Sequence, residues 1–191
     1  RGSSLTNQLL TLARHEPGDT PEHKMIAVNM NDIVKNISLS LVNDALRKNI
    51  DLGFEPSAEP AWVMGDNLGL IDMLTNLLDN AIRYTHASGR VTARVNLSSD
   101  NVIVSVEDNG PGIAPADRER VFERFYRVLG TNEIGSGLGL AIVKEIARLH
   151  QAEIRLDDAP GGRGTLFSIR FNRVVASAQN KFVETEMSSA A

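Results

Sequence analysis

The sequence predicts an α/β fold, in which short strands alternate with amphipathic helices. The clearest helix is the run LIDMLTNLLDNAIRY at residues 70–84, where apolar side chains recur at helical spacing. The clearest strands are residues 90–97 and 102–106, where apolar and polar residues alternate on either side of a hairpin turn. These patterns predict helices that cover a sheet containing an antiparallel pair.

Composition limits the possible classes of protein. A chain of 191 residues with 42% hydrophobic content can bury one substantial core and still carry flanking segments. The formal net charge of -4 gives no general attraction to nucleic acid or anionic lipid, so we expect no nucleic-acid partner. The absence of cysteine excludes disulfides and thiolate metal sites. Since no run approaches about 18 apolar residues, we expect the fragment itself to be soluble.

The order of the elements predicts one domain with flanks. Residues 1–16 contain a short amphipathic helix, built on Leu5, Leu9, Leu10, Leu12 and Ala13, and residues 17–24 are a polar linker with Pro17, Gly18 and Pro21. We place the domain at residues 25–173 and a flexible tail at 174–191. Because so short a helix is marginal alone, we expect that the chain was cut from a longer protein.

Within the domain, the patterns predict further strands and one long helix. The strands are residues 25–28, 50–54, 61–64, 152–156 and 165–171. The helix is residues 30–47, with its inward face formed by Ile33, Val34, Ile37, Leu41, Val42 and Leu46.

The helix at 70–84 carries a polar row opposite its apolar face. Asn76, Asn80 and Arg83 follow one another at i, i+4 and i+7. Amide oxygens are neutral, hard ligands for Mg²⁺, and a guanidinium makes forked contacts with phosphate. The row therefore suits a metal-bound polyphosphate, although a solvated polar face is the alternative for this helix taken alone.

The second strand of the hairpin runs into a glycine motif, Asp108-Asn109-Gly110-Pro111-Gly112. A carboxylate at a strand end, beside backbone without side chains, can accept from the exocyclic amine of a flat ring such as adenine. Alternatively, the motif is an ordinary glycine turn.

A run of aromatic and cationic residues follows at 121–127. Phe122 and Phe125 could anchor a segment whose Arg124 and Arg127 reach a phosphate, or they could be core residues with solvated neighbours. The irregular polar stretch at residues 128–134 has the composition of a mobile lid.

A second glycine motif opens a helix at residues 135–140, GSGLGL. Glycines at a helix start let backbone N–H groups and the positive dipole end approach a phosphate. A dinucleotide-binding fold is the competitor, but here the glycines follow a polar loop instead of a strand and are spaced G-x-G-x-G. The P-loop pattern is absent from the sequence.

These motifs, in this order, resemble the ATP-binding catalytic domain of bacterial sensor histidine kinases. NLLDNAIRYT at 76–85 resembles the family's N box, residues 108–112 its G1 box, 122–125 its F box and 135–140 its G2 box, while residues 162–165 are similar to its last glycine motif. The resemblance covers about residues 25–173. It implies a Bergerat-type fold, a two-layer sandwich of a mixed, largely antiparallel sheet with helices on one face, shared with gyrase, chaperone and mismatch-repair ATPases.

The resemblance also implies roles for single residues, with ATP and Mg²⁺ as the bound species. Asn80 would bind Mg²⁺, Asn76 would assist at metal or phosphate, and Tyr84 would lie near the nucleotide. Asp108 would accept from the adenine amine, in a base pocket shaped by Gly110, Gly112 and Ile113.

The remaining roles concern the phosphates. The phosphates would be lined by residues of the second glycine motif, namely Gly135, Ser136, Gly137, Leu138, Gly139 and Leu140, with Thr165 as a further nucleotide contact. The catalytic candidates are Asn76, Asn80, Arg83, Arg124 and Arg127. The family often has Lys at the position of Arg83, and a guanidinium still supplies positive charge there.

One position separates mechanisms within the superfamily. The related hydrolases have a water-activating Glu four residues before the metal-binding Asn, where this chain has Asn76. An amide cannot act as a base, which favours a kinase over an ATPase. A standalone ATP-driven clamp or chaperone and a non-catalytic nucleotide-sensing module remain the alternatives.

The phosphate acceptor is not expected in this chain. None of His15, His23, His86 and His150 lies in the family's H-E-x-x-x-P pattern, so the acceptor would be a histidine on a dimerisation hairpin whose second helix ends within residues 1–16. The resemblance implies that a response regulator receives the phosphate. It also implies a homodimeric inner-membrane parent, of which this fragment would be a monomeric cytoplasmic portion.

Overall fold

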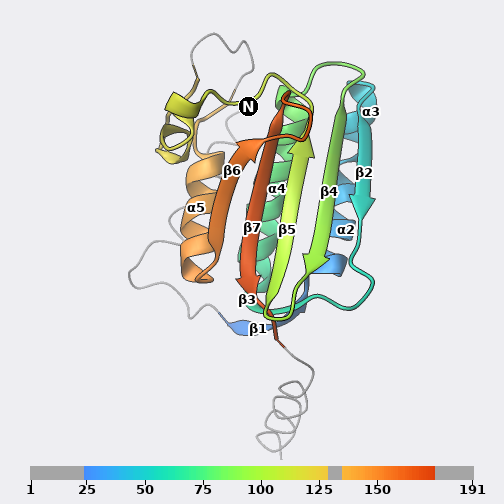
Figure 1. The fold of residues 1–191 in the computed structure, drawn as a ribbon, viewed down its shortest axis with the longest axis vertical. Coiled ribbons are helices and arrows are strands. Elements are labelled where there is room, and N and C mark those ends of the chain that lie inside the picture. The colour runs from blue at the N-terminus through green and yellow to red at the C-terminus, as the bar shows by residue number, and fades with distance from the viewer. Residues whose placement is uncertain (1–23, 129–134, 175–191) are drawn as a thin grey trace, which may run out of the picture.

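The computed structural model describes residues 24–128 and 135–174, and its elements lie between Met25 and Asn172. A five-stranded sheet with the order β2-β4-β5-β7-β6 forms one layer, and helices α2, α4 and α5 cover one of its faces (Figure 1). β2 pairs with β4 in parallel and the other neighbours are antiparallel. The predicted two-layer sandwich with a largely antiparallel sheet is therefore confirmed.

The elements have the following bounds. The strands are β1 (Met25–Asn29), β2 (Asp51–Glu55), β3 (Trp62–Asp66), β4 (Arg90–Leu97), β5 (Asn101–Asp108), β6 (Glu153–Asp158) and β7 (Thr165–Asn172). The helices are α2 (Met30–Ser40), α3 (Val42–Arg47), α4 (Asn67–Tyr84) and α5 (Gly139–Leu149), with short 3₁₀ helices η1 (Pro115–Asp117) and η2 (Arg120–Phe122).

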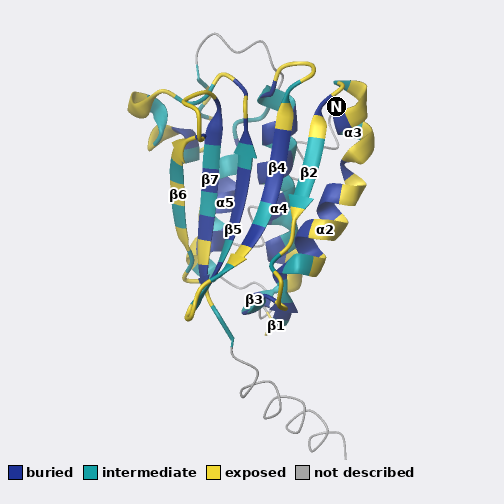
Figure 2. Cartoon of the chain, turned by 45° about the vertical axis from the view of Figure 1, so that its right-hand side comes forward, coloured by how far each residue is buried: buried dark blue, intermediate teal, exposed yellow. Residues whose placement is uncertain are grey.

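The core lies between the sheet and the helices. Alternate side chains of the central strands point inward, and Figure 2 shows the buried residues concentrated on β4, β5, β7 and the inner faces of α4 and α5. The opposite face of the sheet is polar. There Arg94 on β4 binds Glu55 on β2 at 2.7 Å and Glu107 on β5 at 2.5 Å. Burial of Arg94 acts to lower its pKa, but the hydrogen bonds and charges of these two carboxylates raise it above its ordinary value.

The predicted helix over residues 30–47 is wrong in one respect, because it breaks at Leu41 into α2 and α3. Ser40 donates its hydroxyl proton to the Ile37 carbonyl at 2.7 Å, and such local bonds compete with the helical ladder. The buried face nevertheless keeps its helical phase across the break, because Ile37, Leu41 and Ala45 follow one another at i, i+4 and i+8. Val42 and Leu46, expected inside, are 37% and 66% exposed, and Ala45 is buried in their place.

The longest helix begins at a well-defined cap. Asp66 accepts hydrogen bonds from the backbone N–H groups of Leu68 and Gly69, as an N-cap residue does. The predicted apolar arc is buried along the helix at Leu70, Leu74, Leu77, Leu78, Ala81 and Ile82, while Ile71 is only half-buried. This stripe packs against the sheet and α5, and it turns the predicted polar row away from the core.

A small antiparallel pair, β1 with β3, lies at one end of the sandwich (Figure 1). The end of the described chain meets this pair, since the Val174 N–H donates to the Trp62 carbonyl at 2.9 Å. None of the helices in residues 24–128 and 135–174 is both long and apolar enough to cross a membrane. The predictions for residues 1–23, for the lid beyond Val128 and for the tail from Val175 concern residues outside the described part.

Candidate nucleotide-binding site

A cleft of about 320 Å³ opens between the second half of α4, the start of α5 and the ends of β5 and β7. These segments are far apart in the sequence, and the sheet order brings them together. Most of the predicted site residues line the cleft, namely Asn76, Asn80, Arg83, Tyr84, Asp108, Gly112, Ile113, Arg127, Gly135, Ser136, Gly137, Gly139, Leu140 and Thr165.

The polar row of α4 forms one wall of the cleft. The Asn76 side-chain NH₂ group donates to the Asp72 carbonyl at 2.8 Å, so its Oδ1 atom is the one left to face the cleft. The Asn76 Oδ1 atom faces the first residue of α5, and Asn80 Nδ2 lies beside it. Arg83 forms an ion pair with Asp79 at 2.5 Å, one turn back on the same helix.

Glycine backbone forms the opposite wall. A Cβ atom placed on Gly139 would lie 3.0 Å from Asn76 Oδ1 and 3.4 Å from Asn80 Nδ2, and one on Gly135 would lie 3.1 Å from the Arg83 guanidinium. α5 starts at Gly139 with no side chain capping its first N–H groups. Unsatisfied N–H groups and the positive helix end are the usual means of binding a phosphate, and here two asparagine amides and a guanidinium face them.

A buried carboxylate closes the other end of the cleft. Asp108, 7% exposed at the end of β5, accepts from the Gly110 N–H at 2.8 Å and from the Thr165 hydroxyl and N–H on β7. Gly164 (φ +98°) allows this approach, because a Cβ there would lie 2.7 Å from the Asn109 Cα. The carboxylate is therefore fixed in direction, as recognition of a single donor group requires.

Comparison with known proteins decides the family. The family described as "Histidine kinase-, DNA gyrase B-, and HSP90-like ATPase" matches residues 65–174, more than half of the chain. The chain belongs to this family. Its ATP-binding catalytic domain is of the kind found in sensor histidine kinases, which are the relatives described next.

Two curated relatives are sensor proteins. The swarming motility regulation sensor protein RssA of Serratia marcescens is 39% identical over 170 residues, which are 88% of this chain and 36% of RssA. The sensor protein kinase PmrB of Pseudomonas aeruginosa is 39% identical over 165 residues, 86% of this chain and 34% of PmrB. The chain thus spans about a third of the length of these relatives.

Solved structures agree. The mycobacterial sensor histidine kinase MprB superposes with a TM-score of 0.67 at 34% identity, covering 78% of this chain and 97% of that one. Full-length ShkA in complex with AMPPNP gives a TM-score of 0.78 at 27% identity, covering 91% of this chain and 36% of ShkA.

Three of the predicted site residues of this kinase-type domain do not line the cleft. Gly110 lies behind Asp108, bound to its carboxylate, and Leu138 is fully buried in the core. Arg124 is exposed and contributes nothing to the cleft lining, whereas Arg127 does.

The segment that resembles the family's F box is held from both sides. Phe122 packs edge-on against Phe167 with ring centroids 6.3 Å apart, as expected of either an anchor or a core residue. Phe125 is instead 64% exposed and has a positive φ of 64°, and its N–H donates to the Gly137 carbonyl at 2.9 Å. The second glycine motif is thereby tied to this segment through a backbone hydrogen bond.

Among the polar residues of the cleft lining, sequence reasoning missed Asp79 and Tyr126. The signal for Asp79 was its place four residues before Arg83, the spacing of a helical ion pair. The Tyr126 hydroxyl donates to Asp117 at 2.6 Å, which raises the pKa of Tyr126, and its ring stacks under the Arg120 guanidinium at 4.4 Å. Tyr126 is therefore fixed at the mouth of the cleft.

The two histidines of the described part, His86 and His150, do not line the cleft. His150 ends α5, where its Nε2 accepts from the Asp66 N–H at 3.0 Å and its Nδ1 lies 2.7 Å from the Ile146 carbonyl. This ring joins α5 to the start of α4. His86 is exposed just beyond α4. His15 and His23 lie outside the described residues.

Proposed function

We propose that the cleft binds ATP with Mg²⁺ and presents the γ-phosphate to a histidine carried by another segment of the parent protein. The observation that carries the proposal is the facing of two walls, with asparagine amides and a guanidinium on α4 and bare glycine backbone at the start of α5. The cleft between them has a volume of about 320 Å³, and a Cβ atom at Gly139 or Gly135 would crowd Asn76 or Arg83.

The residues present fit a hydrated Mg²⁺ and a triphosphate. Asn80, with Asn76, offers the neutral oxygen ligands that Mg²⁺ accepts, and Mg²⁺ bound there would supply positive charge beside the phosphates. Arg83 and Arg127 line the same wall and mouth, and each can bind phosphate oxygens. Asp108 would accept from the adenine amine, and the AMPPNP bound to ShkA supports an adenine nucleotide here.

The identity of residue 76 favours transfer to a protein over hydrolysis. Asn76 lies one turn before Asn80 and faces Gly139, but its side chain cannot take a proton from water. Phosphoryl transfer depends largely on positioning and on stabilisation of charge, both of which this wall can supply. The nucleophile must then come from elsewhere.

We propose that the nucleophile is a histidine on the parent's dimerisation hairpin, and that a response regulator later takes the phosphate. The solved relative MprB is named a sensor histidine kinase, which supports a histidine as the acceptor, while the response regulator follows from the resemblance of the motifs. A membrane-anchored homodimeric parent is part of the same proposal.

Transfer in trans tests the function. The chain is incubated with radiolabelled ATP, Mg²⁺ and a separate hairpin fragment carrying the histidine, and label on the fragment is expected together with negligible release of inorganic phosphate. Rapid hydrolysis by the chain alone would instead support an ATP-driven clamp. Binding of ATP with no transfer to any hairpin would support a nucleotide-sensing module.

A further inference from the structure

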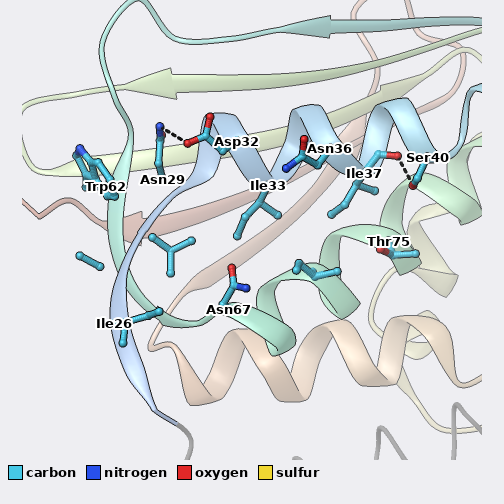
Figure 3. A pocket seen from close by; sticks show the side chains of 13 residues that line it. Ile26, Asn29, Asp32, Ile33, Asn36, Ile37, Ser40, Trp62, Asn67 and Thr75 are labelled. Atoms are coloured by element: carbon cyan, nitrogen blue, oxygen red, sulfur yellow. Dashed lines mark hydrogen bonds between the residues drawn. The ribbon is translucent and has the colours of Figure 1, made fainter.

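A second concave surface lies on the helical side, away from the cleft. It is a groove of about 560 Å³ between β1, α2 and the first half of α4, and the function proposed above does not use it (Figure 3). Its apolar lining is contributed by Ile26, Val28, Ile33, Ile37 and Ile71. Polar side chains form its rim, among them Asn29, Asp32, Asn36, Ser40, Asn67 and Thr75.

The two long walls of this groove have the spacing of helix faces. Ile33, Ile37 and Ser40 recur at i, i+4 and i+7 along α2, and Figure 3 shows Ile33 and Ile37 turned toward α4. On the α4 wall, Asn67, Ile71 and Thr75 recur at i, i+4 and i+8. Each wall is about 10–12 Å long at 1.5 Å per residue. Such a groove fits an amphipathic helix of two to three turns that inserts apolar side chains from one face.

We propose that the groove binds residues 5–13 of this same chain. Leu5, Leu9 and Leu12 recur at i, i+4 and i+7, so on a helix they would form an apolar ridge of about 10 Å, equal to the walls. The eleven residues 14–24 that follow can span up to about 36 Å, and they lead directly into β1, which is itself a wall of the groove. The connection between residues 5–13 and the groove is thus long enough for the two to be in contact.

Charge does not oppose this occupant. Residues 5–13 carry no charge and are followed at once by Arg14, while Asp32 is the charged residue of the groove lining. The segment after Val174 also starts near the groove, because Val174 is bonded to Trp62, which lines it. That segment carries Glu184 and Glu186 against Lys181, so it has the same sign of charge as Asp32, and it lacks a leucine ridge. The proposal does not depend on nucleotide binding, and it places in the groove, in this chain, the leucines that are expected to end the second helix of the hairpin.

A spin label tests the docking in the intact chain. Because the sequence has no cysteine, Gln8→Cys provides a unique site for a nitroxide. In the isotope-labelled chain of 191 residues, we expect the nitroxide to broaden the amide NMR signals of residues 26–37 and 67–75 selectively. Asn36→Arg, at an exposed rim position, should restore these signals by blocking the groove. Leu39→Arg, at an exposed position of the same helix outside the groove, should leave the loss unchanged.

Other outcomes overturn the proposal. Full groove signals in the labelled chain would mean that residues 5–13 do not dock. Signal loss that persists in Asn36→Arg would mean that they bind elsewhere. Signal loss that disappears on dilution of the labelled chain would assign the groove to a second copy. Loss of the same signals from a label at Thr185→Cys, and not from Gln8→Cys, would assign it to the C-terminal segment.

Discussion

The two halves of α4 share one buried stripe but face different surroundings. Residues 67–75 face the isoleucines of α2 across the groove, whereas residues 76–84 face the glycine backbone at the start of α5. The chemistry of the lining therefore separates the two hollows. A wall of side chains accepts apolar groups, and a wall of bare N–H groups accepts anions.

The buried stripe that the two halves of α4 share should be the part of this helix where a substitution lowers stability most. Leu74 is fully buried between the two halves, and Leu74→Ala should lower the free energy of unfolding by about 2–5 kcal/mol, through lost burial and the cavity left behind. Urea denaturation measures this change. Leu68→Ala, at a 67% exposed position on the same helix, is the control and should change stability by less than about 0.5 kcal/mol. Equal losses would mean that the stripe does not hold the helix.

The effect of the close approach between the Gly164 and Asp108 backbones can be measured separately from that of a positive φ, because Gly161 and Gly164 have similar φ values. Gly161 (φ +101°) has nothing within 4 Å of a would-be Cβ, while at Gly164 (φ +98°) the Asp108 carbonyl and Asn109 occupy that space. Gly161→Ala should cost about 1–2 kcal/mol for its backbone conformation alone. Gly164→Ala should lower the free energy of unfolding by about 1–3 kcal/mol more than Gly161→Ala does, as measured by thermal unfolding. A smaller loss in Gly164→Ala would contradict the tight contact.

The difference between the halves of α4 predicts different effects for two asparagines. Asn80→Ala should weaken Mg-dependent binding of an ATP analogue by more than the roughly 10–100-fold that loss of an outer-shell partner costs a metal site. Asn67→Ala, at an exposed position on the groove half, should leave binding unchanged. Isothermal titration calorimetry with and without Mg²⁺ separates the two. Retained affinity in Asn80→Ala would place the metal elsewhere.

The smallest expected effect concerns the base end of the cleft. Asp108→Asn replaces one acceptor oxygen with an NH₂ group, so the preference for ATP over GTP should fall by about 3–10-fold, the value of one hydrogen bond. The ratio of the two dissociation constants measures it. An unchanged ratio, in a variant whose unfolding temperature is also unchanged, would remove Asp108 from base recognition.

Local sequence patterns predicted much of this molecule. The stripe and the polar row of α4 could be predicted because both arise from helical periodicity within 15 residues. The two glycine motifs could be predicted because glycine adopts backbone conformations and close approaches that other residues disfavour. The break at Leu41 could not be predicted, because it has no Gly or Pro and is associated with a serine bond to a carbonyl. The groove was also missed, since it exists only after β1 pairs with β3 and α2 packs beside α4.

The bond between Asp108 and Thr165 joins residues 57 positions apart. Until the last strand of the sheet is in place, the carboxylate has no partner on β7 and the base end of the cleft is open. A chain in which β7 has not yet paired therefore lacks a fixed base end, and nucleotide added to a refolding reaction should act mainly after this non-local pairing step. By mass action the nucleotide would stabilise the complete topology more than any partly folded form.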